Sequence, residues 1–121
     1  MIADLKFCKI GFFDDYVICN VNEGVTLCTK KNKEITVFLL NHFQNKPFVY
    51  ITERIHSYSV DPSIYSHSSK VETLKGFAVV AFNYFAASSA DYEKNFLEKP
   101  FEIFNETIAA EHWAKNLLKT V

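Results

Sequence analysis

Seven residues without a polar side chain occupy positions 76–82, and this run constrains the fold more than any other feature of the chain. A strand that is apolar on both faces has to be covered on both faces, as in the centre of a parallel sheet. Parallel strands need long crossover connections, which are usually helices. The run therefore predicts an α/β protein.

Strand and helix patterns alternate along the rest of the chain. Short apolar runs predict strands at residues 6–12, 16–21, 48–52, 76–82 and 101–104. Apolar spacings of three and four predict helices at about 29–43, 62–73 and 86–97, and a last helix after Asn105. The order β-β-α-β-α-β-α-β-α implies a mixed, mostly parallel five-stranded sheet with about four helices. No linker, repeat or low-complexity segment is visible, so we expect residues 1–121 to form a single domain.

The first two strands are predicted to form a hairpin with its turn at Asp14 and Asp15. Alternation of side chains on both strands then places six apolar side chains on one face. The facing pairs are Cys8 with Val21, Ile10 with Cys19, and Phe12 with Val17. That agreement between the two strands supports the hairpin.

Capping residues predict where two helices begin. Asp61 is expected to cap the second helix, with Pro62 at its first position, and Asn105 to cap the last helix. After the central strand, Phe82 is expected in the core. The roles of Tyr84 and Phe85 stay open, because either residue can line a pocket or contact a partner.

Composition and charge exclude several classes of function. The 121-residue chain has a net charge of −1 with scattered Lys and Arg, so it lacks the basic stripe of a nucleic-acid-binding protein. Its longest apolar runs are too short to cross a bilayer, so we expect no membrane insertion. No signal-peptide pattern is visible at the N-terminus. The three cysteines form no CxxC pair, which favours reduced thiols and a cytoplasmic location.

Residues 52–63 hold the densest group of polar side chains. They follow a strand and precede a helix, where parallel sheets place their binding sites. A helix N-terminus suits an anion, and Arg54 can hold a phosphate or carboxylate through two parallel hydrogen bonds. The candidate residues for binding a ligand or partner are Arg54, His56, Ser57, Tyr58, Ser59 and Asp61.

A purely structural role explains the same residues. Arg54 can pair with Glu53 or another acid, and Asp61 can act only as a helix cap. Ser57 and Ser59 can satisfy backbone groups in a turn. Because position in a fold specifies function weakly, both interpretations stay open.

Catalytic, metal and nucleotide-binding signatures are missing from the sequence. His56, Ser57 and Asp61 are the residue types of a triad, but near neighbours in sequence rarely have triad geometry. No G-x-S-x-G motif is present, the four histidines are scattered, and the three glycines are isolated. We therefore expect no catalytic residue, metal or cofactor, and a hydrolase that uses a loop serine is a minor alternative.

Several segments carry a resemblance to a known family. They are residues 46–52, 54–62 and 93–104, and the last helix with Ala109, Ala110 and Trp113. With the order of elements they resemble the STAS fold, named for sulfate transporters and anti-sigma antagonists, and more closely its SpoIIAA-like family of small bacterial proteins. In the antagonists, a partner kinase phosphorylates a serine at the start of the second helix. The resemblance makes Ser63 the candidate for phosphorylation, although Pro62 interrupts the usual Asp-Ser-Ser-Gly type of motif.

These observations lead to one main hypothesis. The chain is expected to be a non-enzymatic, cytoplasmic, STAS-like regulatory or protein-interaction module. It would present residues 54–63 and the neighbouring 83–88 connection to a protein partner or a small ligand, since both segments follow strands at one edge of the sheet. The alternative is a carrier or sensor of a small anionic or apolar, lipid-like ligand. Exposed aromatic side chains would also permit a homodimer.

Overall fold

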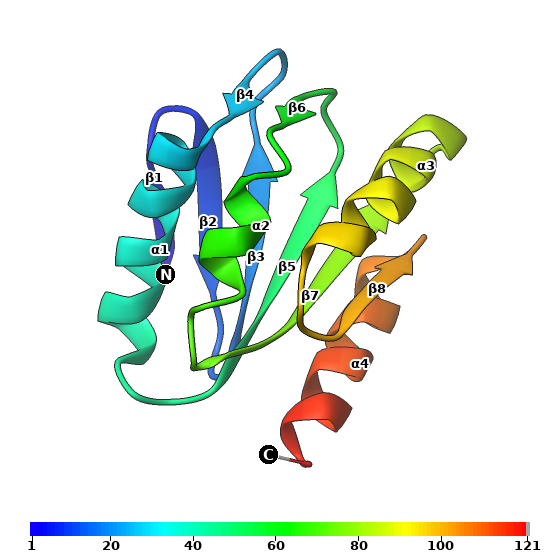
Figure 1. Cartoon of the computed structure of the whole chain (residues 1–121). Helices are drawn as coiled ribbons and strands as arrows, with labels where there is room; N and C mark the ends of the chain where they lie inside the picture. The colour runs from blue at the N-terminus through cyan, green and yellow to red at the C-terminus, as the bar shows by residue number, and fades with distance from the viewer. Residues whose placement is uncertain (121) are drawn as a thin grey trace.

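The computed structural model describes residues 1–120 and contains a six-stranded sheet with helices on both faces (Figure 1). The strands lie in the order β1 (Ile2–Asp4), β2 (Cys8–Phe12), β3 (Tyr16–Val21), β5 (Phe48–Arg54), β7 (Leu74–Ala81) and β8 (Phe101–Phe104). The first three strands are antiparallel, and β3, β5, β7 and β8 are parallel. The predicted α/β class and mixed, mostly parallel sheet are confirmed.

Strand β1 corrects the predicted number of strands from five to six. It has three residues, and Ile2 is 73% exposed, so neither its length nor its burial pattern produces a strand signal. Its place in the sheet comes from pairing with β2, in which Ile2 lies opposite Gly11.

The predicted hairpin register is confirmed. Cys8 lies opposite Val21, Ile10 opposite Cys19, and Phe12 opposite Val17. All six side chains are buried, as the alternation required.

Three helices cover one face of the sheet and one covers the other (Figure 1). Helices α1 (Thr29–Phe43), α2 (Ile64–Ser68) and α3 (Tyr84–Glu93) pack over the larger core. Helix α4 (Thr107–Leu118) packs over the smaller core on the opposite face. The four predicted helices are therefore present, and a short 3₁₀ helix, Lys94–Phe96, continues α3.

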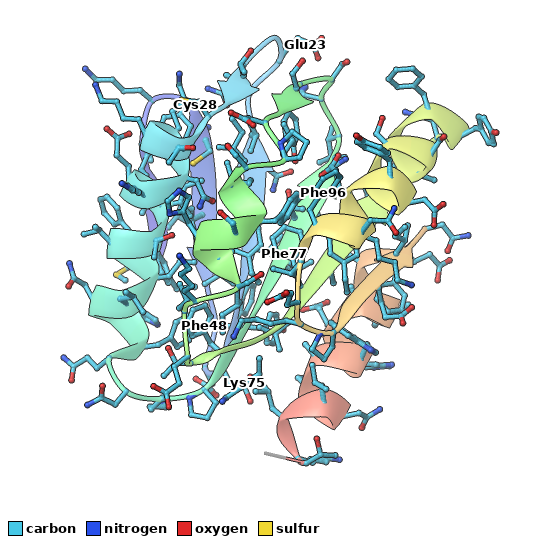
Figure 2. All side chains as sticks on the ribbon, viewed as in Figure 1. Glu23, Cys28, Phe48, Lys75, Phe77 and Phe96 are labelled. Carbon is cyan, nitrogen blue, oxygen red and sulfur yellow. The ribbon has the colours of Figure 1, made fainter. Side chains whose placement is uncertain are left out.

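Stacked aromatic rings fill the larger core. The ring of Phe77 on β7 lies 4.9 Å from that of Tyr50 and 5.2 Å from that of Phe101, measured between centroids. Phe48 stacks on Phe43 of α1 at 4.7 Å. Phe48 and Phe77, labelled in Figure 2, lie between the sheet and the helices.

Close approach of α4 to the sheet depends on Gly76 of β7. A Cβ atom at this position would lie 2.5 Å from Leu117 Cδ2 and 3.0 Å from Trp113 Cη2. Any larger residue would therefore have to displace side chains of α4. The central strand itself is buried on both faces, as its apolar run predicted.

Several predicted boundaries are wrong. Helix α2 covers 64–68 rather than about 62–73, and Ser63 rather than Asp61 stands at its N-cap position. Four serines within 63–69 weaken the helix, which explains its short length. Helix α4 begins after Glu106, not Asn105. The central strand ends at Ala81, which leaves Phe82 51% exposed instead of in the core.

Candidate functional site

The carboxyl ends of β5 and β7 meet the start of α3, and this junction holds the polar residues that the sequence singled out. A pocket of about 240 Å³ is lined by Arg54, His56, Ser57 and Tyr58 from one segment, and by Asn83 and Phe85 from the other. The predicted meeting of the 54–63 and 83–88 segments is therefore present.

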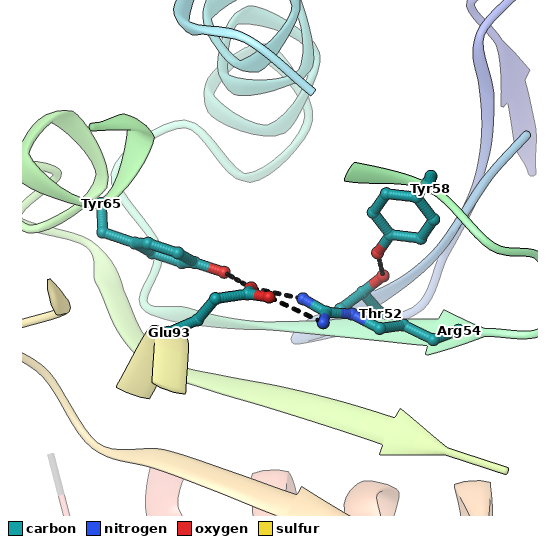
Figure 3. A network of polar contacts seen from close by, with 5 residues as sticks. All are labelled: Thr52, Arg54, Tyr58, Tyr65 and Glu93. Atoms are coloured by element: carbon teal, nitrogen blue, oxygen red, sulfur yellow. Dashed lines mark hydrogen bonds and ion pairs between the residues drawn. The ribbon is translucent and has the colours of Figure 1, made fainter. Parts of the chain in front are cut away.

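Arg54 does not point from a loop into solvent. It is the last residue of β5, is 7% exposed, and forms a buried ion pair with Glu93 of α3 (Figure 3). The two Arg54–Glu93 hydrogen bonds measure 2.8 and 2.5 Å. The Arg54 guanidinium, which can hold an external phosphate or carboxylate, thus already binds a carboxylate inside the protein. This corrects the interpretation of Arg54 as a residue that binds an external anion.

Tyrosine side chains surround this ion pair. The Tyr65 hydroxyl donates to Glu93 at 2.5 Å, and the ring of Tyr58 lies 5.5 Å from the Arg54 guanidinium carbon. The Tyr58 hydroxyl in turn shares a 3.1 Å hydrogen bond with Thr52. Three elements, β5, α2 and α3, are joined by this network (Figure 3).

Arg54 stays charged at neutral pH, and Tyr58 and Tyr65 keep their protons. Burial opposes the charge on Arg54, but its hydrogen bonds to Glu93 and the charge interactions with Tyr58, Glu93 and Tyr65 together outweigh burial and raise the pKa of the guanidinium. Burial raises the pKa of Tyr65, and the neighbouring Glu93 carboxylate raises it further. Burial also raises the pKa of Tyr58. A charged arginine with protonated phenols around it acts as a structural clamp rather than as an acid or base.

His56 and Ser57 lie on the exposed rim of the pocket. The Ser57 backbone N–H donates to Glu23 Oε1 at 2.8 Å, and His56 Nδ1 lies 4.0 Å from the same oxygen. Glu23, labelled in Figure 2, therefore holds the tip of this segment from the β3–β4 connection. Sequence reasoning missed Glu23, because nothing local links it to a residue more than 30 positions away.

Ser59 is part of a strand that the sequence did not predict. Strand β6 (Ser59–Val60) pairs in parallel with β4 (Thr26–Leu27), with Ser59 opposite Thr26. Two-residue strands are too short to show a period in the sequence. This small ladder fixes the second half of the 54–63 segment.

A second pocket lies between this segment and α3. Its volume is about 470 Å³, and its lining includes Ser59, Val60, Pro62, Phe85, Ser88 and Tyr92. Arg54, Tyr58, Phe85 and Ser89 line both pockets. Phe85 is 77% exposed and stands between the two hollows.

Asp61 and Ser63 lie together beyond the pockets. Asp61 Oδ1 accepts a 3.0 Å hydrogen bond from the Ser63 backbone N–H, and this contact lowers the pKa of the carboxyl. The Ser63 hydroxyl is exposed and lies 3.3 Å from that of Thr29. Phosphorylation of Ser63 stays a prediction, and the phosphate would stand beside the Asp61 carboxylate.

The three triad residue types make contacts with other groups. The Asp61 carboxylate is used by Ser63, and His56 faces Glu23. Within residues 1–120, no three His, Cys, Asp or Glu side chains gather as a metal site requires. Over the same residues, no helix has the length and apolar character of a membrane span.

Glu93 is the main residue that sequence reasoning missed, although a signal was present. Ala86 and Ala90 lie seven and three positions before it, on the same face of the helix. A carboxylate in an apolar stripe indicates a buried partner. Arg54 is that partner.

Comparisons with known proteins inform the fold. No protein-family model matches the sequence, and no curated protein matches it. The structure is similar to the crystal structure of an uncharacterized protein of the DUF3478 family, with a SpoIIAA-like fold, from Shewanella loihica PV-4. The match has a TM-score of 0.62 and 14% identity, and it covers 94% of this chain and 98% of that one. The chain therefore has the SpoIIAA-like fold that its sequence predicted.

Proposed function

We propose that this protein is a non-enzymatic, cytosolic interaction module that binds a protein partner through the outer side of α3 and the adjoining pockets. The observation that carries the proposal is the exposure of aromatic side chains at α3. Tyr84 is 88%, Phe85 77% and Tyr92 61% exposed. Rings of this kind are enriched at protein interfaces.

The pattern of α3 is the reverse of an ordinary surface helix. Its buried residues are Ala90 and Glu93, while its aromatic residues face solvent. An amphipathic helix normally turns its large apolar residues toward the core. The exposed rings contribute little to holding α3 on the sheet, so their presence is best explained by a contact outside the chain.

The pockets beside Phe85 supply shape and polar groups for that contact. The two hollows can receive side chains of a partner, and His56, Ser57 and Ser59 stand at their rims. The Arg54–Glu93 ion pair holds in place the Arg54 side chain, which lines both hollows. A rigid floor with a polar rim and aromatic anchors is the usual anatomy of a recognition surface.

The alternative of an apolar ligand carrier has less support. The cavity between α1 and the sheet, lined by Leu39, Phe48 and Phe77 among others, has a volume of about 20 Å³. That space holds about one water molecule. For a small anion, the charge of Arg54, which lines both pockets, is already neutralised by Glu93.

Site-specific photocrosslinking tests the proposal. Benzoylphenylalanine at position 85 should give a covalent adduct with a partner in a lysate of the source organism. The same residue at position 108 is the matched control, because Ile108 on α4 is 59% exposed and equally apolar. Adducts that are equal at both positions, or absent at 85, would contradict the proposal. Phe85→Ser should abolish capture of the identified partner, whereas Ile108→Ser should not.

A further inference from the structure

We infer that the partner of the α3 face is a second copy of this chain, packed antiparallel about a two-fold axis near Ser88. The inference rests on the proposed function and names the occupant of the same surface. Figure 1 shows α3 at the border of the molecule, and Figure 2 shows ring-bearing side chains projecting from its start.

The outer face of α3, formed by Phe85, Ser88, Ser89 and Tyr92, has a large side chain at each end and small side chains in the middle. The order of side-chain sizes is therefore the same in both directions along the helix. Phe85 and Tyr92 are separated by seven residues, or about two turns, and Ser88 and Ser89 lie between them. An antiparallel copy would place Phe85 of one chain against Tyr92 of the other, twice. The serines at the crossing allow the two helices to approach closely. A two-fold interface requires this kind of self-complementary surface.

The exposed aromatic area near α3 reaches the size of such an interface when all of its rings are counted. Exposed fractions of 88, 77, 61, 51 and 39% for Tyr84, Phe85, Tyr92, Phe82 and Phe96 correspond to about 600 Å² per chain, at ~200 Å² for a whole aromatic side chain. Complete burial of all these rings in two copies would remove about 1,200 Å², the lower end of the range for specific interfaces. The pocket rims add to this area.

The charges on this face favour a second copy over a lipid surface. Phe85, Ser88, Ser89 and Tyr92 are uncharged, and a net charge of −1 gives little repulsion between two chains. Attraction to an anionic membrane needs a cluster of Lys and Arg. Helix α3 contains neither residue, and Lys94 follows it alone.

A disulfide trap tests the position of the axis. In a Cys28→Ser background, which leaves the buried Cys8 and Cys19, Ser88→Cys should form a disulfide-linked dimer within minutes when copper phenanthroline is the oxidant. The control, Asn116→Cys, places an exposed cysteine on α4, on the opposite face of the sheet. Oxidation of Ser88→Cys no faster than Asn116→Cys would overturn the inference.

The mass in solution provides a second readout. Light scattering at 100 µM should give twice the 13.9 kDa chain mass for the wild type and the single-chain mass for Phe85→Ser. A wild type that is monomeric would contradict the proposed dimer. A monomer that floats with phosphatidylserine vesicles would contradict it as well. If position 85 of that monomer still crosslinks another protein, the proposed function stands and only the self-association fails. If position 85 crosslinks nothing, both fail.

Discussion

Replacing Glu93 with alanine removes the acceptor of both Arg54 hydrogen bonds and of the Tyr65 hydroxyl. Arg54 and Glu93 have side chains only 8 and 7% exposed, so water cannot easily take the place of the lost carboxylate. Breaking a buried ion pair by removal of one partner costs about 3–5 kcal/mol. We expect Glu93→Ala to be destabilised by this amount.

The size of this loss is measurable by urea unfolding. With a urea dependence of about 1.5–2 kcal/mol per M, the midpoint should fall by roughly 2 M. Glu23→Ala is the matched control, since its side chain is 69% exposed and contacts His56 and the Ser57 backbone. That substitution should change the free energy of unfolding by less than about 0.5 kcal/mol.

A combined variant distinguishes two contributions to the free energy of unfolding. One is the cost of leaving Arg54 without its carboxylate, and the other is the net contribution of the whole ion pair. Arg54→Met, Tyr65→Phe and Glu93→Leu together replace the polar groups with apolar ones of similar size. Buried ion pairs exchanged in this way are often neutral or stabilising, so we expect the triple variant within about 1 kcal/mol of wild type. A Glu93→Ala loss below about 1 kcal/mol would refute the reasoning. So would a triple variant less stable than Glu93→Ala.

Three further predictions concern stability. Gly76→Ala should cost about 1–3 kcal/mol in urea unfolding, because the new methyl group meets Trp113 and Leu117. Asn83→Ala should cost about 1 kcal/mol, because it removes the side-chain cap that accepts from the Ala86 N–H at 2.8 Å. The unfolding free energy should fall as pH rises above about 10, since Tyr65 has a raised pKa and keeps its proton in the folded state after the unfolded chain has lost it. Tyr65→Phe should flatten that fall.

The fold could be predicted from the sequence wherever a long pattern repeats. Alternation fixed the facing pairs of β2 and β3, and the apolar run identified β7 as a strand covered on both faces. Strands β1, β4 and β6 have three or two residues, too few for a period to appear. They form because neighbouring backbone groups need hydrogen-bond partners, which is a property of the assembled structure.

The two segments of the candidate site meet as predicted, and of the two interpretations left open for Arg54 the structure shows pairing with an acid. Parallel topology brought the 54–63 and 83–88 segments together, as predicted. From its polar sequence neighbours, Arg54 was expected either to hold an external anion or to pair with an acid. Its burial depends on Glu93, which lies 39 residues away on α3. Local sequence cannot show that contact.

Glu93, which accepts the hydrogen bonds of the clamp, and the exposed rings of Tyr84, Phe85 and Tyr92 lie on one helix, and this connects stability with association. Helix α3 buries little apolar area of its own, since its inner face consists of Ala90 and Glu93. Self-association would bury its outer rings and would supply the apolar contact that the single chain lacks. Because a dimer stabilises the folded state by mass action, the wild-type urea midpoint should rise with protein concentration. The midpoint of Phe85→Ser should not, and a wild-type midpoint constant from 1 to 100 µM would contradict this coupling.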